Sequence, residues 1–483
     1  MADAQTAPAA NMLSLSDELI IMLFAGVECK GDKKALRLVS RRARDLVDAG
    51  VTQANVHTGS PDTGLGVVRR WPALSWLRVH FGHAPSQEEL RAVLGAPLTS
   101  LTYLEFSAAA GSGPECLAAL AAAAPGWRAL RSLSLSHGPQ YGDAVVQALM
   151  PPACIHLEEL DLCRNGLGPA AAAALSAAGW TAALSLRRLS LCDNPLLGDA
   201  GTAALAQGAW PCLESLHLSG TGLGPAGAGA LAAGRQAWPA LQALSLDDNC
   251  GLAGSAGVQA LLGAAVWTAL TNLRLSNNKL GAGGAAALAA GAALPALRSL
   301  ALGGNELGGA GAWALAQARW PHLSSLDLTN NELGDAGAAA VAFGAAAQWP
   351  ALRSLSLDGN DVRCDGAWAL AQGRWRCLED LSLTENCVGH AGAAALAAAA
   401  CLPCALRYLA LTDNFLGDSG VEALMCATWP LLDSLHVGGN DMAAGGARAL
   451  AAAWTAARLP ALRALSCGFN PLGDAGARAL ARC

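Results

Sequence analysis

A leucine pattern recurs along most of the chain. One clear copy is LSSLDLTNNELGDAG at residues 323–337, and related copies begin at Leu157, Leu352 and Leu406. All follow the template L-x-x-L-x-L-x-x-N-x-L, which leads into a Gly-rich step and an Ala/Leu segment. The alternation in L-x-L predicts a short β-strand, with its leucines in the core and the intervening residues pointing outward.

An asparagine, replaced once by threonine, follows each predicted strand and recurs at intervals of 26 to 30 residues. Its amide can bond to backbone groups left unpaired where the chain turns, so neighbouring repeats can form a ladder. The members of this column are Asn165, Asn194, Thr221, Asn249, Asn278, Asn305, Asn331, Asn360, Asn386, Asn414, Asn440 and Asn470. Weaker copies start at Leu74, Leu101 and Leu130, so we expect about 15 repeats over residues 70–483.

The Ala/Leu segment of each repeat predicts a short helix. Asp335, Asp418 and Asp474 stand where an acidic side chain caps a helix or favours its first turn. Pro169 and Pro225 take the equivalent position, which suits a first-turn proline. Such helices are too short and too poor in large residues to be stable alone, so the array must fold by stacking its repeats.

These repeats resemble the leucine-rich repeat family, in particular its ribonuclease-inhibitor-like class. The resemblance covers about residues 70–483 and implies an α/β solenoid, a curved horseshoe with parallel strands on the concave face and helices on the convex face. Trp-Pro recurs just before the repeat start, as at Trp320-Pro321 and Trp349-Pro350. We interpret the tryptophan as a plug in the return from helix to strand, and the proline as the end of the helix.

Composition narrows the possible functions. The 483 residues carry a net charge of −6, which argues against a nucleic-acid-binding protein. Apolar runs are interrupted before they reach the length of a membrane span, and the N-terminal segment has no basic region typical of a secretory signal. The 15 cysteines are irregularly spaced, as in a protein with reduced thiols. We therefore expect a cytoplasmic protein without membrane partners, with the nucleus as the alternative.

Catalytic signatures are lacking in the sequence. We find no phosphate-binding G-x-x-x-x-G-K-[ST], no HExxH and no G-x-S-x-G, and the CxxC at Cys401–Cys404 has no second pair. Cys163 and Cys192 take the same outward position in adjacent repeats, so their thiols can be close. We interpret them as free thiols rather than as a redox or metal site. The sequence predicts no enzyme, no cofactor and no metal.

The outward strand positions form the candidate binding surface, because the core does not need them. They are mostly small, polar and mildly acidic, which favours a basic or polar protein partner of modest affinity. In the alternative, the partner binds the loops. The candidate residues are Asp161, Arg188, His217, Asp247, Arg274, Asp327, Asp358, Asp380 and Tyr408.

Residues before the repeats follow another pattern. Residues 1–12 are expected to be disordered, and residues 13–60 predict a helical head. In its second helix, Leu36, Val39, Ala43 and Leu46 form one apolar stripe, opposite a basic stripe that includes Arg37. The plainest interpretation is a head that caps the first repeat.

The head also resembles an F-box, which typically reads Leu-Pro-x-Glu-Leu, an apolar helix, and Leu-x-x-Val-Ser/Cys-Arg/Lys-x-Trp-Arg. The matching residues are Leu15, Asp17, Glu18, Leu19, Leu36, Val39, Ser40, Arg41 and Arg44. Ser16 replaces the usual proline and Ala43 the usual tryptophan. The resemblance implies a substrate receptor of a cullin-RING ubiquitin ligase. Its repeats would bind the substrate, and the adaptor subunit would dock on Leu19, Leu23, Leu36 and Val39. The alternative is a general leucine-rich-repeat scaffold whose head is only a cap.

Overall fold

The computed structural model describes residues 53–58, 74–95, 98–108, 113–136, 141–149, 156–177, 185–263, 266–290, 294–399 and 402–481. The adaptor-docking residues predicted in the head, Leu19, Leu23, Leu36 and Val39, lie outside these ranges. The chain divides into an N-terminal unit, Met1–Ser215, and a C-terminal unit, Leu216–Cys483. Each unit is described by itself.

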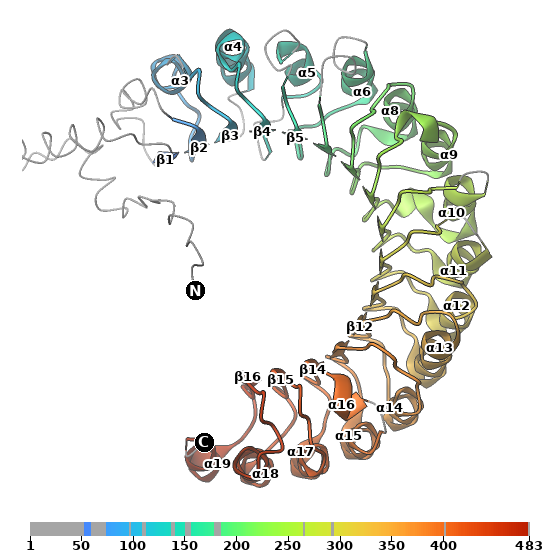
Figure 1. The fold of residues 1–483 in the computed structure, drawn as a ribbon. Helices are drawn as coiled ribbons and strands as arrows, with labels where there is room; N and C mark the ends of the chain where they lie inside the picture. The colour runs from blue at the N-terminus through green and yellow to red at the C-terminus, as the bar shows by residue number, and fades with distance from the viewer. Residues whose placement is uncertain are drawn as a thin grey trace, which may run out of the picture. The chain divides into compact units, whose positions relative to one another are not determined.

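The N-terminal unit alternates parallel strands with helices on one side of the sheet (Figure 1). Its strands are β1 (Gln53–Thr58), β2 (Trp76–Phe81), β3 (Tyr103–Ala108), β4 (Ser132–Ser134), β5 (Glu159–Asp161) and β6 (Arg188–Ser190). Its helices are α3 (Gln87–Leu94), α4 (Gly113–Ala123), the 3₁₀ turn η2 (Ala124–Gly126), α5 (Ala144–Ala148), α6 (Pro169–Ser176) and α8 (Gly198–Ala206). Neighbouring strands pair in chain order. Strand β1 lies within the segment predicted as a helical head, so that prediction is wrong for residues 53–58 and the sheet begins before residue 70.

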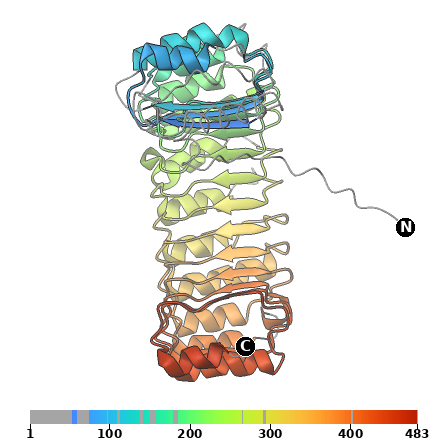
Figure 2. The same cartoon turned by 90° about the vertical axis from the view of Figure 1, so that its left-hand side faces the viewer.

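Strand β7 (Ser215–His217) spans the division between the units. The strands that follow in the C-terminal unit are β8 (Ala243–Ser245), β9 (Asn272–Arg274), β10 (Ser299–Ala301), β11 (Ser325–Asp327), β12 (Ser354–Ser356), β13 (Asp380–Ser382), β14 (Tyr408–Ala410), β15 (Ser434–His436) and β16 (Ala464–Ser466). They are parallel and pair in chain order, and Figure 2 shows them side by side. The predicted α/β alternation is confirmed.

The helices of the C-terminal unit lie on one side of its sheet (Figure 1). They are α9 (Pro225–Ala233), α10 (Gly254–Leu262), α11 (Gly281–Ala290), α12 (Gly308–Leu315), α13 (Gly334–Ala347), α14 (Cys364–Ala371), α15 (Gly389–Ala397), α16 (Leu402–Ala405), α17 (Gly417–Cys426), α18 (Ala444–Thr455) and α19 (Gly473–Leu480), with the 3₁₀ turns η3 (Arg235–Ala237) and η4 (Cys250–Leu252). The central strand leucines, such as Leu300 and Leu326, are buried against helix leucines such as Leu315. None of the helices described in either unit is long and apolar enough to cross a membrane.

The asparagine ladder runs through the core of the C-terminal unit. The Asn305 Oδ1 accepts the backbone N–H of Asn278 at 2.9 Å, and its Nδ2 donates to the carbonyls of Leu275 and Leu302, both at 2.8 Å. Asn305 is itself fully buried, and its own N–H donates to Oδ1 of Asn331 at 3.0 Å. The predicted ladder is confirmed: each side chain satisfies backbone groups of its own repeat and of the preceding one.

Acidic residues in the first turn of one helix accept hydrogen bonds from the start of the next helix. Asp335 opens α13, as predicted, but its Oδ1 accepts the N–H groups of Arg363 and Gly366 at 2.7 and 2.8 Å. It therefore caps the next helix, α14, whose own N-cap Arg363 makes no side-chain cap. Asp418 does the same for α18, since its Oδ1 accepts the N–H of Gly446 at 2.7 Å. Capping thus couples neighbouring repeats.

The tryptophans of the Trp-Pro pairs fill the return from helix to strand. Trp349 is 1% exposed, its ring stacks on Trp320 at 6.2 Å, and its Nε1 donates to the Ala318 carbonyl at 3.1 Å. The ring also lies against Gly344, where an added Cβ would come within 2.8 Å of it. The packing interpretation of these tryptophans is confirmed.

Candidate functional site

The outward strand positions of the C-terminal unit form two rows, which we call the strand face. The strand register places Asp380 beside Tyr408, and Asp327 beside Ser356. The residues of both rows are mostly half-buried, whereas the leucines between them are buried from β8 to β15. The predicted orientation of these positions is therefore confirmed, and their polar groups are available for contacts within the chain or with a partner.

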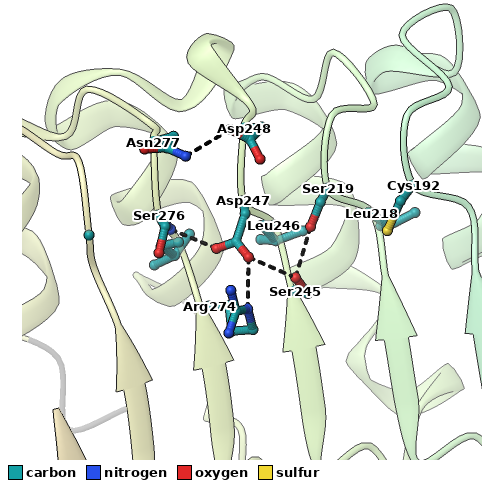
Figure 3. Close-up of polar contacts among 12 residues, drawn as sticks. Cys192, Leu218, Ser219, Ser245, Leu246, Asp247, Asp248, Arg274, Ser276 and Asn277 are labelled. Atoms are coloured by element: carbon teal, nitrogen blue, oxygen red, sulfur yellow. Dashed lines mark hydrogen bonds and ion pairs between the residues drawn. The ribbon is translucent and has the colours of Figure 1, made fainter. Parts of the chain in front are cut away.

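Two of the predicted binding residues meet on β8–β9 (Figure 3). The Asp247 Oδ2 pairs with Nε of Arg274 at 2.8 Å, and Oδ1 accepts the Ser276 N–H at 2.7 Å. The Ser245 hydroxyl donates to the same carboxylate at 3.3 Å and contacts the Ser219 hydroxyl at 2.8 Å. Asp247 is buried, so its carboxylate serves the internal network, while the Arg274 side chain stays 59% exposed.

Other predicted acids likewise accept hydrogen bonds from this chain. The Asp358 Oδ1 accepts the Thr384 N–H at 2.7 Å and the Ser382 hydroxyl at 2.6 Å. The Asp327 Oδ1 accepts the Thr329 N–H at 3.0 Å. These carboxylates satisfy backbone N–H groups where the strands end, a structural role that the sequence analysis did not assign.

An outward aspartate also accepts hydrogen bonds from this chain in the N-terminal unit. The Asp161 Oδ1 accepts the Cys163 N–H at 3.0 Å, and its Oδ2 accepts the Ser134 hydroxyl at 2.9 Å. Arg188 pairs with Glu159, its register partner on β5, at 2.9 Å. His217, on β7, is half-buried.

Asp380 differs from these acids. Among the described residues its carboxylate makes no hydrogen bond or ion pair; it is half-buried on β13. Burial raises the pKa of Asp380, and the negative charges of Glu379 and Asp433 raise this pKa further. The charge of Arg407 opposes the rise in pKa, but this guanidinium already pairs with Glu379 at 3.5 Å. Asp380 is therefore an acid without a dedicated cation.

Tyr408 and His436 extend the surface beside Asp380. Their rings lie 5.1 Å apart at an angle of 44°, and the His436 ring contacts the Ser434 hydroxyl at 3.0 Å. Burial raises the pKa of Tyr408, and the charges of Asp358 and Asp380 raise this pKa further, so the phenol stays neutral. We call Asp380, Tyr408 and His436 the β13–β15 patch.

A second group of exposed side chains was not predicted from the sequence. Trp313, Phe343 and Trp368 lie on the consecutive helices α12, α13 and α14, with exposed fractions of 44%, 47% and 60%. The rings of Trp313 and Phe343 are 5.7 Å apart. The available signal was the AWAL motif, which places a tryptophan in two helices that are otherwise poor in large residues.

The part of the chain that the structure describes contains no candidate metal-binding site. There, no group of three or more His, Cys, Asp or Glu side chains could hold a metal ion. Cys401 and Cys404, the cysteines of the CxxC motif, are not among the residues whose side chains the structure describes. The β13–β15 patch can bind a cation through Asp380 and offer ring faces, which suits recognition of a peptide side chain.

Solved structures of other proteins have similarity to this chain at low sequence identity. "Crystal structure of Rad7 and Elc1 complex in yeast" has a TM-score of 0.42 and 17% identity, covering 68% of this chain and 84% of that one. An internalin (inlF) from Listeria monocytogenes str. 4b F2365 has a TM-score of 0.40 and 16% identity, covering 82% and 92%. The TLR13–ssRNA13 complex has a TM-score of 0.45 and 19% identity, covering 83% and 60%.

The family comparison agrees with the repeated unit of strand, buried asparagine and helix. A comparison with curated proteins gave no match. The family model described as "Leucine Rich repeat" matches residues 153–176, 211–232, 268–289, 294–316, 321–342, 376–397 and 404–425. These matches, together with the fold, show that the chain carries leucine-rich repeats.

Proposed function

We propose that this protein is a non-catalytic recognition module whose strand face binds a protein partner through a lysine or arginine side chain. The observation that carries the proposal is Asp380, a half-buried carboxylate whose nearest charges are mainly negative. A partner's cation relieves the repulsion with Glu379 and Asp433 and forms a charge-assisted hydrogen bond. Glu385 and Asp413, exposed just beyond the strands, add to the negative potential.

Tyr408 and His436 supply the rest of the contact. Tyr408 lies beside Asp380 in the strand register, and the His436 ring packs against Tyr408 on the side away from Asp380. An aromatic face attracts the cation and the methylene groups that carry it. Asp247, Asp327 and Asp358 accept backbone N–H groups and so hold the ends of their strands in place. A single cation site of this kind fits modest affinity.

A peptide selection tests this proposal. A phage-displayed peptide library is panned against the full chain, and we expect the recovered peptides to carry lysine or arginine. The double substitution Asp380→Asn with Tyr408→Ala should weaken their binding at least about tenfold. Trp368→Ala is the matched control, because it removes an exposed aromatic ring from the helices. Peptides without a basic residue, or peptides that lose binding only in the control, would refute the assignment.

Binding of such a peptide is expected to weaken on acidification. The raised pKa of Asp380 means that its carboxylate takes up a proton at a pH above the ordinary aspartate value of about 3.9. Affinity should therefore be full near neutrality and fall as pH drops through that raised pKa. Fluorescence anisotropy between pH 7 and pH 4 measures the fall. The Asp380→Asn variant should bind weakly at neutral pH, and its affinity should lack the fall that protonation of Asp380 causes.

Folding should not change with that substitution at neutral pH. A raised pKa in the folded chain means that folding favours the protonated form, so any stabilisation is present at low pH and is lost as pH rises through the folded pKa. The neutral amide of Asp380→Asn therefore removes a repulsion, and we expect the free energy of unfolding to change by no more than about 0.5 kcal/mol.

For the head we propose an F-box-like role, in which the chain is a substrate receptor of a cullin-RING ubiquitin ligase. The support is the sequence motif that contains Leu19, Leu36 and Val39. We expect the full chain to bind purified ligase adaptor, and Leu36→Asp with Val39→Asp to abolish binding. Arg37→Ala, on the opposite stripe, is the control. An unaltered chain that does not bind the adaptor would leave only the cap or scaffold alternative.

Two further assignments belong to this proposal. Repeat intervals of 26 to 30 residues, each with an α-helix, support the ribonuclease-inhibitor-like class. The described cysteines, such as the exposed Cys212, form no disulfides, which supports a reducing compartment, the cytoplasm or the nucleus.

A further inference from the structure

Two cysteines lie beside each other just past the ends of strands β5 and β6 in the N-terminal unit. Strands β5 and β6 pair with Asp161 opposite Ser190, and the same offset places Cys163 opposite Cys192. Backbone hydrogen bonds continue past the strand ends: the Leu162 N–H donates to the Ser190 carbonyl at 2.9 Å, and the Arg164 N–H to the Cys192 carbonyl at 3.0 Å. The register of the two cysteines is therefore fixed from both sides.

The side chains of this pair meet at the Ser190 hydroxyl. The Cys163 Sγ lies 2.9 Å from the Ser190 hydroxyl, which lies 3.6 Å from the Cys192 Sγ. A hydrogen bond between the two thiols is the first cause that raises the pKa of Cys163, followed by burial and the charge of Asp161. Neither cysteine is in a disulfide and both are half-buried, so a small reagent in solution can reach them.

The backbone geometry suits a covalent bond between them. Neighbouring parallel strands lie about 4.8 Å apart. A disulfide needs a Cα–Cα distance of about 4.4–6.8 Å and a Cβ–Cβ distance of about 3.5–4.5 Å. Register partners on one face of a sheet meet the first requirement, and a small approach of the two backbones together with rotation of the side chains would meet the second.

We propose that Cys163 and Cys192 form a dithiol site that exchanges with a low-molecular-weight disulfide such as oxidised glutathione. One cysteine loses its proton, attacks a glutathione sulfur, and forms a mixed disulfide while the first glutathione leaves and takes up a proton. The second cysteine then attacks the protein sulfur of the mixed disulfide and expels the second glutathione in the same way. The protein dithiol loses two electrons, and oxidised glutathione gains them as two thiols.

The surroundings of the pair set the speed of this exchange. The raised pKa of Cys163 keeps most of the site as protonated thiol near neutrality, and only the thiolate attacks a disulfide. The site therefore responds to a sustained shift in the thiol–disulfide balance rather than to a brief one. The resulting bond would join two adjacent repeats, on the face that carries Asp161 and Arg188.

Disulfide mapping on the full, folded chain tests the proposal. The chain is incubated with oxidised glutathione, alkylated and digested with trypsin, which cuts at Arg164 and Arg188 and so separates the two cysteines. We expect a Cys163–Cys192 linked peptide at least about tenfold more abundant than any other cysteine pair, because proximity favours the second step. Dithiothreitol should remove it.

Single variants separate the two steps. Cys192→Ser should accumulate a glutathione adduct on Cys163, Cys163→Ser the adduct on Cys192, and neither should form the link. Cys212→Ser, which removes an exposed cysteine elsewhere, should behave as the unaltered chain. The proposal is overturned if both cysteines stay free, if each keeps its own glutathione in the unaltered chain, or if other pairs form equally well.

Discussion

Replacing Asn305 with alanine is expected to lower the free energy of unfolding by about 3–5 kcal/mol. The substitution deprives the N–H of Asn278 of its acceptor at 2.9 Å, and the carbonyls of Leu275 and Leu302 of their donor at 2.8 Å. The site is fully buried, so water cannot replace these bonds, and each unsatisfied backbone group costs about 1–3 kcal/mol.

Chemical denaturation combined with amide hydrogen exchange measures this loss. Because a repeat array is stabilised by its nearest neighbours, the loss of protection should concentrate on β9, β10 and β11. The chain itself offers a control: Thr221 occupies the same column, and its hydroxyl donates to the Leu218 carbonyl at 2.7 Å. Asn305→Thr should therefore lose about half as much. An alanine variant as stable as the unaltered chain would contradict the structural role of the ladder.

The second large effect is expected at Trp349. Its replacement with alanine should cost about 3–5 kcal/mol, because the ring is 1% exposed, stacks on Trp320 and donates to the Ala318 carbonyl. Trp368→Ala is the matched control, since 60% of that residue is exposed, and we expect it to change the free energy of unfolding by less than about 1 kcal/mol.

Urea denaturation followed by far-UV circular dichroism compares the two variants without depending on tryptophan fluorescence. The unfolding midpoint should fall clearly for Trp349→Ala and stay near that of the unaltered chain for Trp368→Ala. Equal midpoints for the two variants would contradict the distinction between a tryptophan that fills the core and one that lies on the helix surface.

The repeat could be predicted from the sequence because its signals are local. Alternation of leucines defines the strand, and Asn305 or Asn331 bonds to groups that every repeat presents at the same place. Burial of Trp349 followed from its position before proline, at the end of a helix. These features depend on one repeat and its equivalent neighbours, so one sequence pattern is enough to predict them.

Features that depend on the offset between particular repeats could not be predicted. Asp335 caps the following helix, and Asp247 is held by Ser276 and Arg274 of the next repeat. Each contact depends on the position of a side chain in one repeat relative to the backbone and side chains of the next repeat, and the loop between them sets that position. For the same reason, the outward acids looked equivalent in the sequence, whereas in the structure Asp380 lacks the hydrogen bonds that Asp358 makes.

The most direct test of the account compares two identical substitutions on the strand face. Titration calorimetry measures the affinity of a selected lysine-containing peptide for the full chain, for Asp380→Asn and for Asp327→Asn. Both variants lose one negative charge, but Asp327 already accepts the Thr329 N–H at 3.0 Å, a bond that asparagine can also accept. We predict that Asp380→Asn weakens binding at least about tenfold, or about 1.4 kcal/mol. Asp327→Asn should weaken it less than about twofold. Equal losses in both variants, or no loss in either, would contradict the claim that Asp380 recognises the partner's cation.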